Sequence, residues 1–279
     1  MSTKQNNINN IGVLTSGGDA PGMNAAIRAV VRTCVYYEKT PYGIYQGYEG
    51  LINNEIKKMD AGSVKHIIHQ GGTILKSARS HDFKTEEGME QAWKHIREND
   101  LDALVVIGGD GTFTGAMKFG EKYDFPIVGI PGTIDNDIFG TDFTVGFDTA
   151  VNTVVEAVDK IRDTATSHNR LFFIEVMGRD AGFIAVYSGI AAGSEEVLIP
   201  EKDRGIQKLF DSLRRTSQRQ KTSRLVIVAE GDKNGSVYDL EDKVKEQFGD
   251  RYETKVTILG HVQRGGRPSC TDRVLASRL

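Results

Sequence analysis

Residues 101–112 read LDALVVIGGDGT, and residues 125–137 repeat the same plan as FPIVGIPGTIDND. The apolar runs 101–107 and 125–130 predict buried parallel strands, because both faces of a strand are apolar when helices cover both sides of the sheet. Asp110, Asp135 and Asp137 would then lie at the carboxyl ends of strands, where open α/β sheets bind ligands. Together with glycines that let backbone N–H groups approach an anion, these carboxylates indicate phosphoryl transfer from a Mg-nucleotide.

The alternation of strand, polar turn and helix continues along the chain. Further strands, each followed by a turn that contains glycine or an acidic residue, are expected at residues 11–15, 171–176, 225–229 and 256–259. This rhythm predicts an α/β fold built from doubly wound parallel sheets. Pro21 predicts the start of a helix over 22–32. A long helical pattern over 150–165 separates two groups of strands, so we place the change of domain near residue 146.

The composition predicts an ordinary soluble protein of the cytoplasm. The chain has 279 residues and a formal net charge of −3, which gives no reason to expect nucleic acid or a membrane as a partner. Cys34 and Cys270 lack the spacing of a zinc site or a disulfide framework, and a reducing compartment fits them. The N-terminal stretch is polar, and no apolar run reaches transmembrane length.

Several of these motifs also have a simpler structural explanation, whereas the three glycines of residues 108–111 exceed what a turn requires. Gly17 and Gly18 could serve only the steric needs of a strand-to-helix turn, and residues 135–137 could form only an Asx turn. Four arginines in polar turns could be ordinary surface charges, although the planar guanidinium group suits phosphate: Arg79, Arg170, Arg179 and Arg264.

Six motifs, in order along the chain, carry a resemblance to a known family. They are TSGGDAPGMNAAIR (15–28), GGTILKSAR (71–79), GGDGT (108–112), PGTIDND (131–137), MGRDAG (177–182) and GHVQRGG (260–266). From residue 11 to its end, the chain resembles the ATP-dependent 6-phosphofructokinases of the bacterial type. The resemblance implies two doubly wound, three-layer αβα domains with a catalytic cleft between them. An ATP- and Mg²⁺-binding domain would comprise 1–146 plus 262–279, and a fructose 6-phosphate-binding domain would comprise 147–261.

The implied reaction is a step of glycolysis, in which Mg-ATP phosphorylates the 1-hydroxyl of fructose 6-phosphate to give fructose 1,6-bisphosphate and ADP. Asp135 would be the general base, Thr133 and Asp137 would lie about the phosphoryl group, and Arg179 would stabilise its charge. Asp110 would hold Mg²⁺. The implied ATP contacts are Gly18, Tyr48, Arg79, Ser80, Gly109, Asp110, Gly111 and Thr112. The implied fructose 6-phosphate contacts are Thr133, Ile134, Asp135, Met177, Gly178, Arg179, Glu230, His261, Val262, Gln263 and Arg264.

The resemblance also implies a homotetramer with shared active sites, in which Arg170 and Lys255 would reach the sugar-phosphate pocket of a neighbouring subunit. Lys255 stands where the family commonly carries arginine, and a point ammonium cannot make a bidentate phosphate contact, so substrate affinity or cooperativity should be weakened. An effector pocket is implied at Arg28, Arg32, Arg162, Gly193, Glu195, Arg219 and Lys221. Ala61 and Ser223 replace residues that are commonly arginine and histidine there, so activation by ADP is not expected.

Family members usually continue well past the segment that corresponds to 273–279, so we expect closing secondary structure to be lacking. Pyrophosphate-dependent phosphofructokinases are the nearest alternative. They typically place an acid at the position of Gly111 and a lysine at that of Gly132, so glycine at both positions favours ATP. A non-catalytic nucleotide-sensing homologue would be expected to have lost Asp110 or Asp135. A dinucleotide-dependent dehydrogenase would need the G-x-G-x-x-G turn with a later ribose-binding acid, which this sequence lacks.

Overall fold

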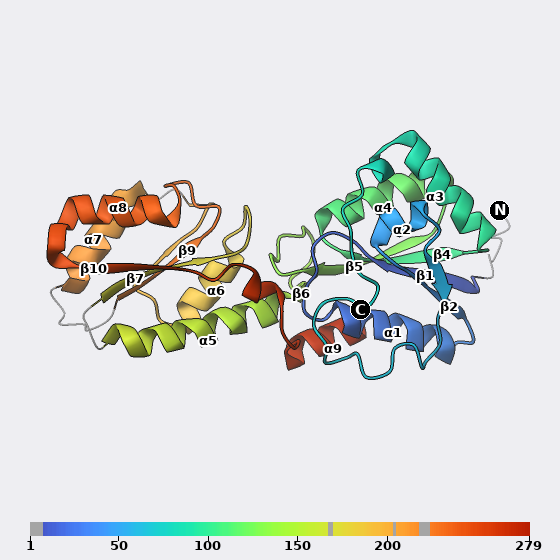
Figure 1. Ribbon diagram of the computed structural model, residues 1–279, viewed down its shortest axis with the longest axis horizontal. Helices are drawn as coiled ribbons and strands as arrows, with labels where there is room; N and C mark the ends of the chain where they lie inside the picture. Colours follow the sequence, from blue (N-terminus) through green and yellow to red (C-terminus); the bar gives the residue numbers. More distant parts are fainter. Residues whose placement is uncertain (1–7, 167–169, 203–204, 218–223) are drawn as a thin grey trace. The chain divides into compact units, whose positions relative to one another are not determined.

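The protein folds into two compact units, each with its own sheet and helices (Figure 1). The computed structural model describes residues 8–166, 170–202, 205–217 and 224–279. The first unit contains the chain up to Thr133 together with 138–146 and 264–279, and the second contains 134–137 and 147–263.

A six-stranded sheet of order β3-β2-β1-β4-β5-β6 forms the centre of the first unit. Its strands are β1 (Asn10–Thr15), β2 (Thr40–Ile44), β3 (Ile56–Lys58), β4 (Ala103–Gly108), β5 (Ile127–Thr133) and β6 (Val145–Gly146). All neighbouring strands are parallel except β2 and β3. The carboxyl ends of β1, β4 and β5 therefore share one edge of the sheet.

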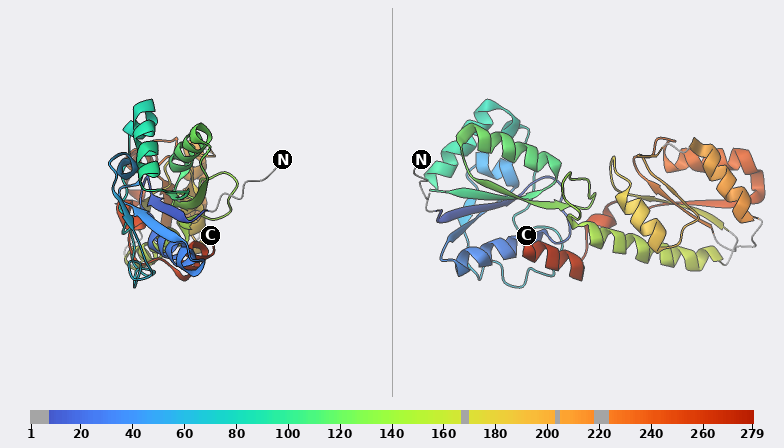
Figure 2. Two further views of the ribbon diagram at one scale, coloured as in Figure 1. Left: turned by 90° about the vertical axis from the view of Figure 1, so that its right-hand side faces the viewer. Right: turned by 180° about the vertical axis from the view of Figure 1, so that it is seen from behind.

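Helices cover both faces of this sheet and complete a three-layer αβα unit (Figures 1 and 2). One face carries α1 (Met23–Tyr36) and α9 (Cys270–Arg278), which pack on each other. The other carries α2 (Gly47–Ile52), the 3₁₀ turn η1 (Asp82–Lys84), α3 (Glu86–Glu98) and α4 (Asp110–Tyr123). Gly22, with a φ of 109°, is the N-cap of α1, so the helix begins just after the predicted start at Pro21.

Aromatic rings fill much of the core between this sheet and the layer of α3 and α4. Tyr48 stacks on Phe83 with ring centroids 4.0 Å apart, and Phe83 lies 5.4 Å from Phe119. Trp93, the only tryptophan of the chain, lies 6.3 Å from Phe119 and stacks on Tyr123 at 4.8 Å. Because aromatic side chains bury large apolar areas, this cluster binds α2, η1, α3 and α4 into one core.

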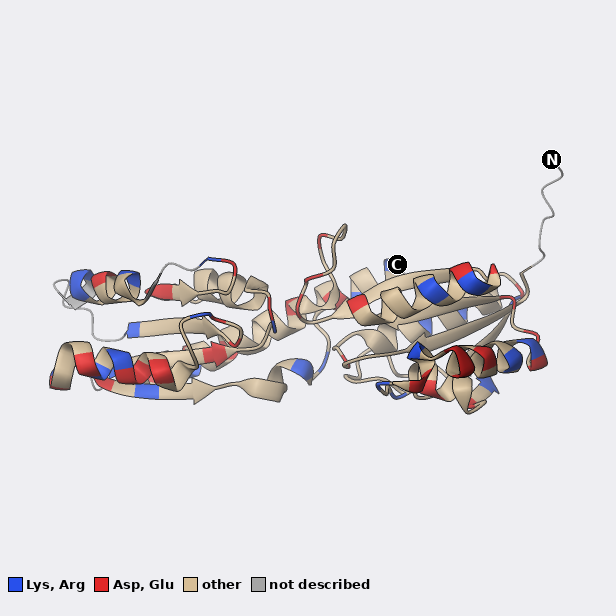
Figure 3. Ribbon diagram, turned by 90° about the horizontal axis from the view of Figure 1, so that it is seen from above, with Lys and Arg blue, Asp and Glu red and all other residues tan. Residues whose placement is uncertain are grey.

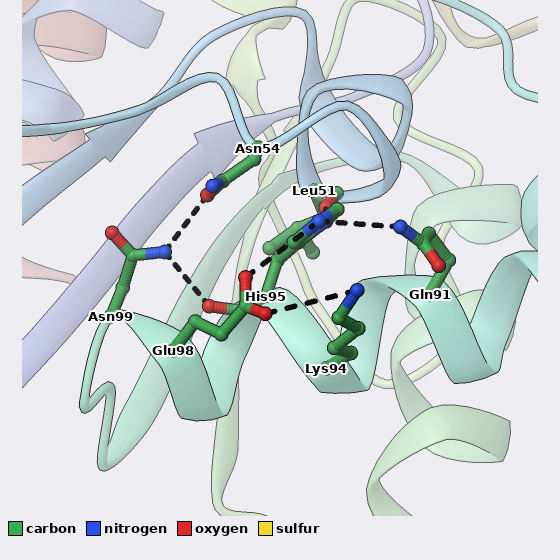
Figure 4. A network of polar contacts seen from close by, with 7 residues as sticks. All are labelled: Leu51, Asn54, Gln91, Lys94, His95, Glu98 and Asn99. Atoms are coloured by element: carbon green, nitrogen blue, oxygen red, sulfur yellow. Dashed lines mark hydrogen bonds and ion pairs between the residues drawn. The ribbon is translucent and has the colours of Figure 1, made fainter.

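A polar network joins the ends of α2 and α3 (Figure 4). His95 is 8% exposed, and its Nδ1 lies 3.0 Å from the carbonyl oxygen of Leu51 at the end of α2. A carbonyl oxygen can only accept, so Nδ1 carries a proton, and Nε2 on the other side of the ring lies 3.3 Å from the Gln91 amide nitrogen. The network holds α2, which carries Tyr48, against α3.

A four-stranded parallel sheet of order β10-β7-β9-β8 forms the centre of the second unit. The strands are β7 (Arg170–Val176), β8 (Glu196–Leu198), β9 (Arg224–Ala229) and β10 (Glu253–Ile258). On one face lie α5 (Phe147–Thr166) and α6 (Phe183–Ala191), and on the other α7 (Gly205–Ser217) and α8 (Val237–Phe248) (Figures 1 and 2). The 3₁₀ turns η2 (Gly249–Arg251) and η3 (Gly260–Arg264) flank β10. In both units most charges lie on helices and turns, and the strands are largely uncharged (Figure 3).

The predicted α/β class is confirmed, and each strand expected from an apolar run is present. The sequence did not reveal β2, β3, β6 or β8, and the antiparallel β3 makes the first sheet mixed, not purely parallel as predicted. Helix α5 begins at Phe147, before the predicted residue 150. Residues 134–137 and 262–263, expected in the first domain, group with the second unit. Across the described ranges, no helix is both long enough and apolar enough to cross a membrane.

Candidate functional site

The GGDGT turn joins β4 to α4 at the carboxyl edge of the first sheet. Gly109 has extended backbone and precedes α4, which begins at the exposed Asp110. Thr112 is buried, and its hydroxyl donates to the carbonyl oxygen of Ser16 at 3.1 Å, which ties this turn to the one after β1. A Cβ added at Gly111 would meet no atom within 4 Å. The first turn of α4 therefore combines open space with backbone N–H groups, the setting in which helices bind anions.

Tyr48 lies beneath this turn and supports it. Its side chain is 5% exposed, and its hydroxyl donates to the carbonyl oxygen of Thr112 at 2.7 Å. Burial raises the pKa of the Tyr48 phenol, which therefore keeps its proton. A Cβ added at Gly115 would lie 3.2 Å from the Tyr48 ring, closer than an ordinary van der Waals contact, so a larger residue there would crowd the ring. Direct contact between Tyr48 and ATP stays a prediction.

Two buried polar side chains hold the loop over residues 70–76. Asn24 of α1, which is 1% exposed, donates from Nδ2 to the carbonyl oxygen of Gly71 at 3.0 Å and accepts at Oδ1 from the Ile74 amide at 2.7 Å. The Thr15 hydroxyl donates to the carbonyl oxygen of Lys76 at 2.7 Å. The sequence analysis did not single out these two residues. A polar residue within the apolar face of the predicted helix over 22–32 was the available signal for Asn24.

The loop leads directly to two predicted ATP contacts, Arg79 and Ser80. Arg79 is exposed, so its guanidinium group is available to an anion. Ser80 accepts at Oγ from the Phe83 amide at 3.1 Å and so fixes the entry into η1. The segment that Asn24 and Thr15 hold therefore leads directly into Arg79, which the resemblance assigns to ATP.

The segment around Gln263 and Arg264 makes contacts in both units. Arg264, in the first unit, donates from Nη1 to the carbonyl oxygen of Asp19 at 3.2 Å, and a Cβ added at Gly18 would lie 2.5 Å from that nitrogen. Gln263, in the second unit, is fully buried and accepts from the Met177 amide at 3.2 Å. The structure thus brings an implied sugar-phosphate contact, Arg264, beside an implied ATP contact, Gly18. Two further predicted residues of η3 are exposed: His261 and Val262.

The end of β5 precedes the predicted general base. The carbonyl oxygen of Thr133 accepts from the Thr144 hydroxyl at 2.6 Å, and Thr133 pairs with Gly146 of β6. The next predicted residues are Ile134 and Asp135, both buried, and Asp137, which is exposed. The hydrogen bond and the strand pairing of Thr133 therefore fix the backbone two residues before Asp135.

The MGRDAG turn follows β7 at the carboxyl edge of the second sheet, where Gly178 and Arg179 have φ values of 145° and 53°. Glu230 holds this turn, because its Oε1 accepts from the Gly178 amide at 3.3 Å and from the Arg179 amide at 2.7 Å. The Arg179 side chain is exposed. Burial, with a smaller contribution from the charge of Glu230, raises the pKa of Glu175 on the preceding strand, an acid that the sequence analysis did not single out.

Arg170 and Lys255 lie near the opposite end of the same sheet. Arg170 is the first residue of β7, and Met177 follows the last, so they are about 23 Å apart along an extended strand at 3.3 Å per residue. Lys255 pairs with Phe172 near the start of β10. Within one chain, these two cations therefore do not join the residues around Met177.

The predicted effector residues belong to both units. Arg28 and Arg32 line a surface pocket of about 400 Å³ in the first unit, together with Tyr36 and Tyr37. In the second unit, Arg162 donates to the carbonyl oxygen of Ala192. Gly193 follows Ala192 directly, and Glu195 accepts from the Leu225 amide at 2.6 Å. Arg219, Lys221 and Ser223 lie outside the described residues.

The residues fit a magnesium ion that arrives with a nucleotide. In the described part of the chain, no group of three or more His, Cys, Asp or Glu side chains is arranged to hold a metal ion by itself. In nucleotide sites Mg²⁺ commonly takes one or two carboxylates and completes its shell with phosphate oxygens and water. Asp110, exposed at the start of α4, offers one such carboxylate.

Comparison with known sequences decides the family. The sequence model of the phosphofructokinase family matches residues 10–279. The chain belongs to the phosphofructokinase family. This confirms the resemblance carried by the six motifs. The positions of Asp110, Asp135 and Asp137 all lie inside the region that matches the family.

Two curated phosphofructokinases illustrate the similarity. An ATP-dependent 6-phosphofructokinase of Halalkalibacterium halodurans is 58% identical over 269 residues, which cover 96% of this chain and 83% of that one. The ATP-dependent 6-phosphofructokinase 2 of Bacteroides thetaiotaomicron is 53% identical over 269 residues, with 96% and 82% covered.

Solved phosphofructokinase structures share the fold. The Saccharomyces cerevisiae enzyme matches with a TM-score of 0.92 at 39% identity, and the match covers 97% of this chain and 40% of the longer yeast chain. A pyrophosphate-dependent phosphofructokinase of Marinobacter aquaeolei matches with a TM-score of 0.82 at 25% identity, covering 97% of this chain and 73% of that one. This architecture is therefore shared with a pyrophosphate-dependent phosphofructokinase, so the fold alone does not identify the phosphoryl donor.

Proposed function

We propose that this protein transfers the γ-phosphoryl group of Mg-ATP to the 1-hydroxyl of fructose 6-phosphate. The proposal rests above all on the 58% identity, over 96% of the chain, to a protein named ATP-dependent 6-phosphofructokinase. The open space at Gly111 supports ATP as the donor, because an acidic side chain there would occupy room that the nucleotide needs. We further propose a cytoplasmic homotetramer with shared active sites.

The residues suit a phosphoryl transfer that depends on positioning and on cations. The first turn of α4 and Arg79 would hold the phosphates, and Asp110 would hold Mg²⁺, which when bound neutralises phosphate charge. Asp135 would accept the proton of the 1-hydroxyl as its oxygen attacks phosphorus, and the ADP oxygen would leave with its electron pair. Arg179 would stabilise the charge on the transferred group.

A coupled assay that follows fructose 1,6-bisphosphate formation tests this function with ATP and with pyrophosphate as alternative donors. We expect turnover with ATP and negligible turnover with pyrophosphate. Activity with pyrophosphate alone would assign the protein to the other donor class. Binding of ATP without turnover, in a preparation that binds fructose 6-phosphate, would instead indicate a nucleotide sensor.

The donor site has its own test in Gly111→Asp. The added carboxylate should raise the KM for ATP severely, because it would meet the nucleotide phosphates with like charge. Thr114→Asp, which adds the same charge at an exposed position later in α4, is the matched control. An unchanged KM for ATP in Gly111→Asp would remove this turn from the nucleotide site.

A further inference from the structure

Glu253 lies between two cations where β10 begins. It pairs in register with Arg170 of β7, and the Arg170 Nε lies 3.0 Å from its Oε2. Lys255 stands two residues further along β10, on the same face of the sheet, with its Nζ 3.1 Å from Oε1 of the same carboxylate. One carboxylate therefore uses both oxygens to bridge both cations.

This cluster is accessible and distinct from the MGRDAG turn of its own chain. The side chains of Arg170, Glu253 and Lys255 are 23%, 47% and 48% exposed. The cluster stands near the amino ends of β7 and β10, whereas the turn follows the carboxyl end of β7. An anion from outside this chain that binds these two cations would therefore lie beside the Glu253 carboxylate.

We propose that Glu253 is an internal counter-ion that limits the affinity of Arg170 and Lys255 for a phosphate group. An incoming phosphate dianion must either displace the Glu253 carboxylate from both cations or bind beside its negative charge. Each alternative reduces the favourable free energy of phosphate binding. Insofar as the phosphate belongs to fructose 6-phosphate, this inference rests on the proposed function.

The electrostatics of the cluster agree with this competition. Arg170 first, and then Lys255, lower the pKa of the Glu253 carboxyl group, so both cations stabilise its charged form. Coupling between two ligands of one site is reciprocal, so phosphate bound to these cations must in turn weaken their hold on Glu253. Lysine at position 255 makes this competition between Glu253 and phosphate stronger. A compact ammonium is less able than the broad guanidinium group of arginine to bind two anions at once.

The test uses Glu253→Gln, which removes the charge and keeps the shape. The control is Glu156→Gln, which removes the same charge from an exposed ion pair of the second unit, where Glu156 Oε1 lies 2.6 Å from Lys160 Nζ. We expect Glu253→Gln to lower the KM for fructose 6-phosphate about two- to fivefold, with kcat and the KM for ATP unchanged. High salt should shrink the gain, and Glu156→Gln should show none.

Calorimetric titration with inorganic phosphate provides a second measurement that needs no enzymatic activity. The dissociation constant of phosphate should fall by a similar factor in Glu253→Gln, and Lys255→Met in that background should abolish the gain. If affinity increases for only one of the two ligands, fructose 6-phosphate or inorganic phosphate, the counter-ion role of Glu253 is supported. The ligand that responds is then the one that binds to Arg170 and Lys255.

Unchanged affinity in both measurements would overturn the proposal. Weakened affinity in either would also overturn it, since Glu253 would then orient the cations for phosphate. If the parent protein fails to phosphorylate fructose 6-phosphate, the proposed function falls, while the phosphate titration still decides the role of Glu253. Thermal unfolding of both glutamine variants checks that the fold is retained.

Discussion

The Asp272 carboxylate accepts a hydrogen bond from the Gly146 amide at 2.8 Å, although 126 residues separate them in sequence. Asp272 is 1% exposed in the first turn of α9. Gly146 pairs with Thr133, two residues before the proposed base Asp135. Helix α9 therefore helps to fix the strand end that leads to this proposed base.

We expect Asp272→Ala to destabilise the protein by about 1–3 kcal/mol, because it leaves the buried amide of Gly146 without its acceptor. It should also lower kcat more than it changes the KM for ATP. Ser269→Ala is the matched control: it removes the hydroxyl that accepts from the Asp272 amide at the start of α9 and should cost about 1 kcal/mol. Asp272→Asn, which keeps an acceptor oxygen, should restore most of kcat. Urea denaturation and steady-state kinetics measure both effects, and equal kcat in the two alanine variants would limit Asp272 to a structural role.

Tyr48→Phe removes a buried hydroxyl and keeps the stacked ring. The carbonyl oxygen of Thr112 would lose its donor, so we expect a loss of about 0.5–1.5 kcal/mol of stability and a raised KM for ATP. Tyr238→Phe, at an exposed position of α8, should change stability by less than about 0.5 kcal/mol. Thermal unfolding and ATP titration are the measurements. An unaltered KM for ATP would show that the GGDGT turn does not depend on this contact.

Asn24→Asp tests the anchor of the loop over 70–76. Aspartate keeps the acceptor for the Ile74 amide but places a carboxylate against the carbonyl oxygen of Gly71, so it should loosen the loop as much as Asn24→Ala does. Hydrogen exchange of residues 70–80 should become faster in both variants, and the KM for ATP should rise because Arg79 follows this loop. Exchange as slow as in the parent protein would refute the anchoring role.

Asp135→Asn should lower kcat by about 10²- to 10⁴-fold while both substrates still bind, because an amide cannot accept the hydroxyl proton. Asp142→Asn is the control, since this exposed carboxylate lies nearby in sequence and is not assigned to the reaction. Calorimetry of substrate binding separates a loss of chemistry from a loss of affinity. Near-normal kcat across the pH range would exclude Asp135 as the base.

Sequence patterns identify the parts of this fold that obey local rules. The run Leu225–Ala229 is fully buried in β9, and a continuous apolar segment of that length predicts such a strand. Strand β2 escapes prediction because Pro41 and Gly43 both disfavour strands, and β6 is only two residues long. Pairing with longer strands determines both.

The candidate site divides in the same way. Glycines and acids in turns after strands are visible in the sequence because their positions follow from local structure. Asn24 and Asp272 act on segments that are 47 and 126 residues away, so only the folded chain shows what they hold. The bridging role of Glu253 likewise depends on the register between β7 and β10, which no local pattern specifies.

The aromatic core of the first unit also makes the protein its own optical probe. Trp93, the only indole in the chain, is linked through Phe119 and Phe83 to Tyr48, whose hydroxyl holds the GGDGT turn. A ligand that shifts the first turn of α4 would repack these rings and change the dielectric surroundings of the indole. Tryptophan emission should therefore report ligand binding at that turn without any added label. Helices α7 and α8 of the second unit contain no tryptophan, so changes confined to them should leave this emission unchanged.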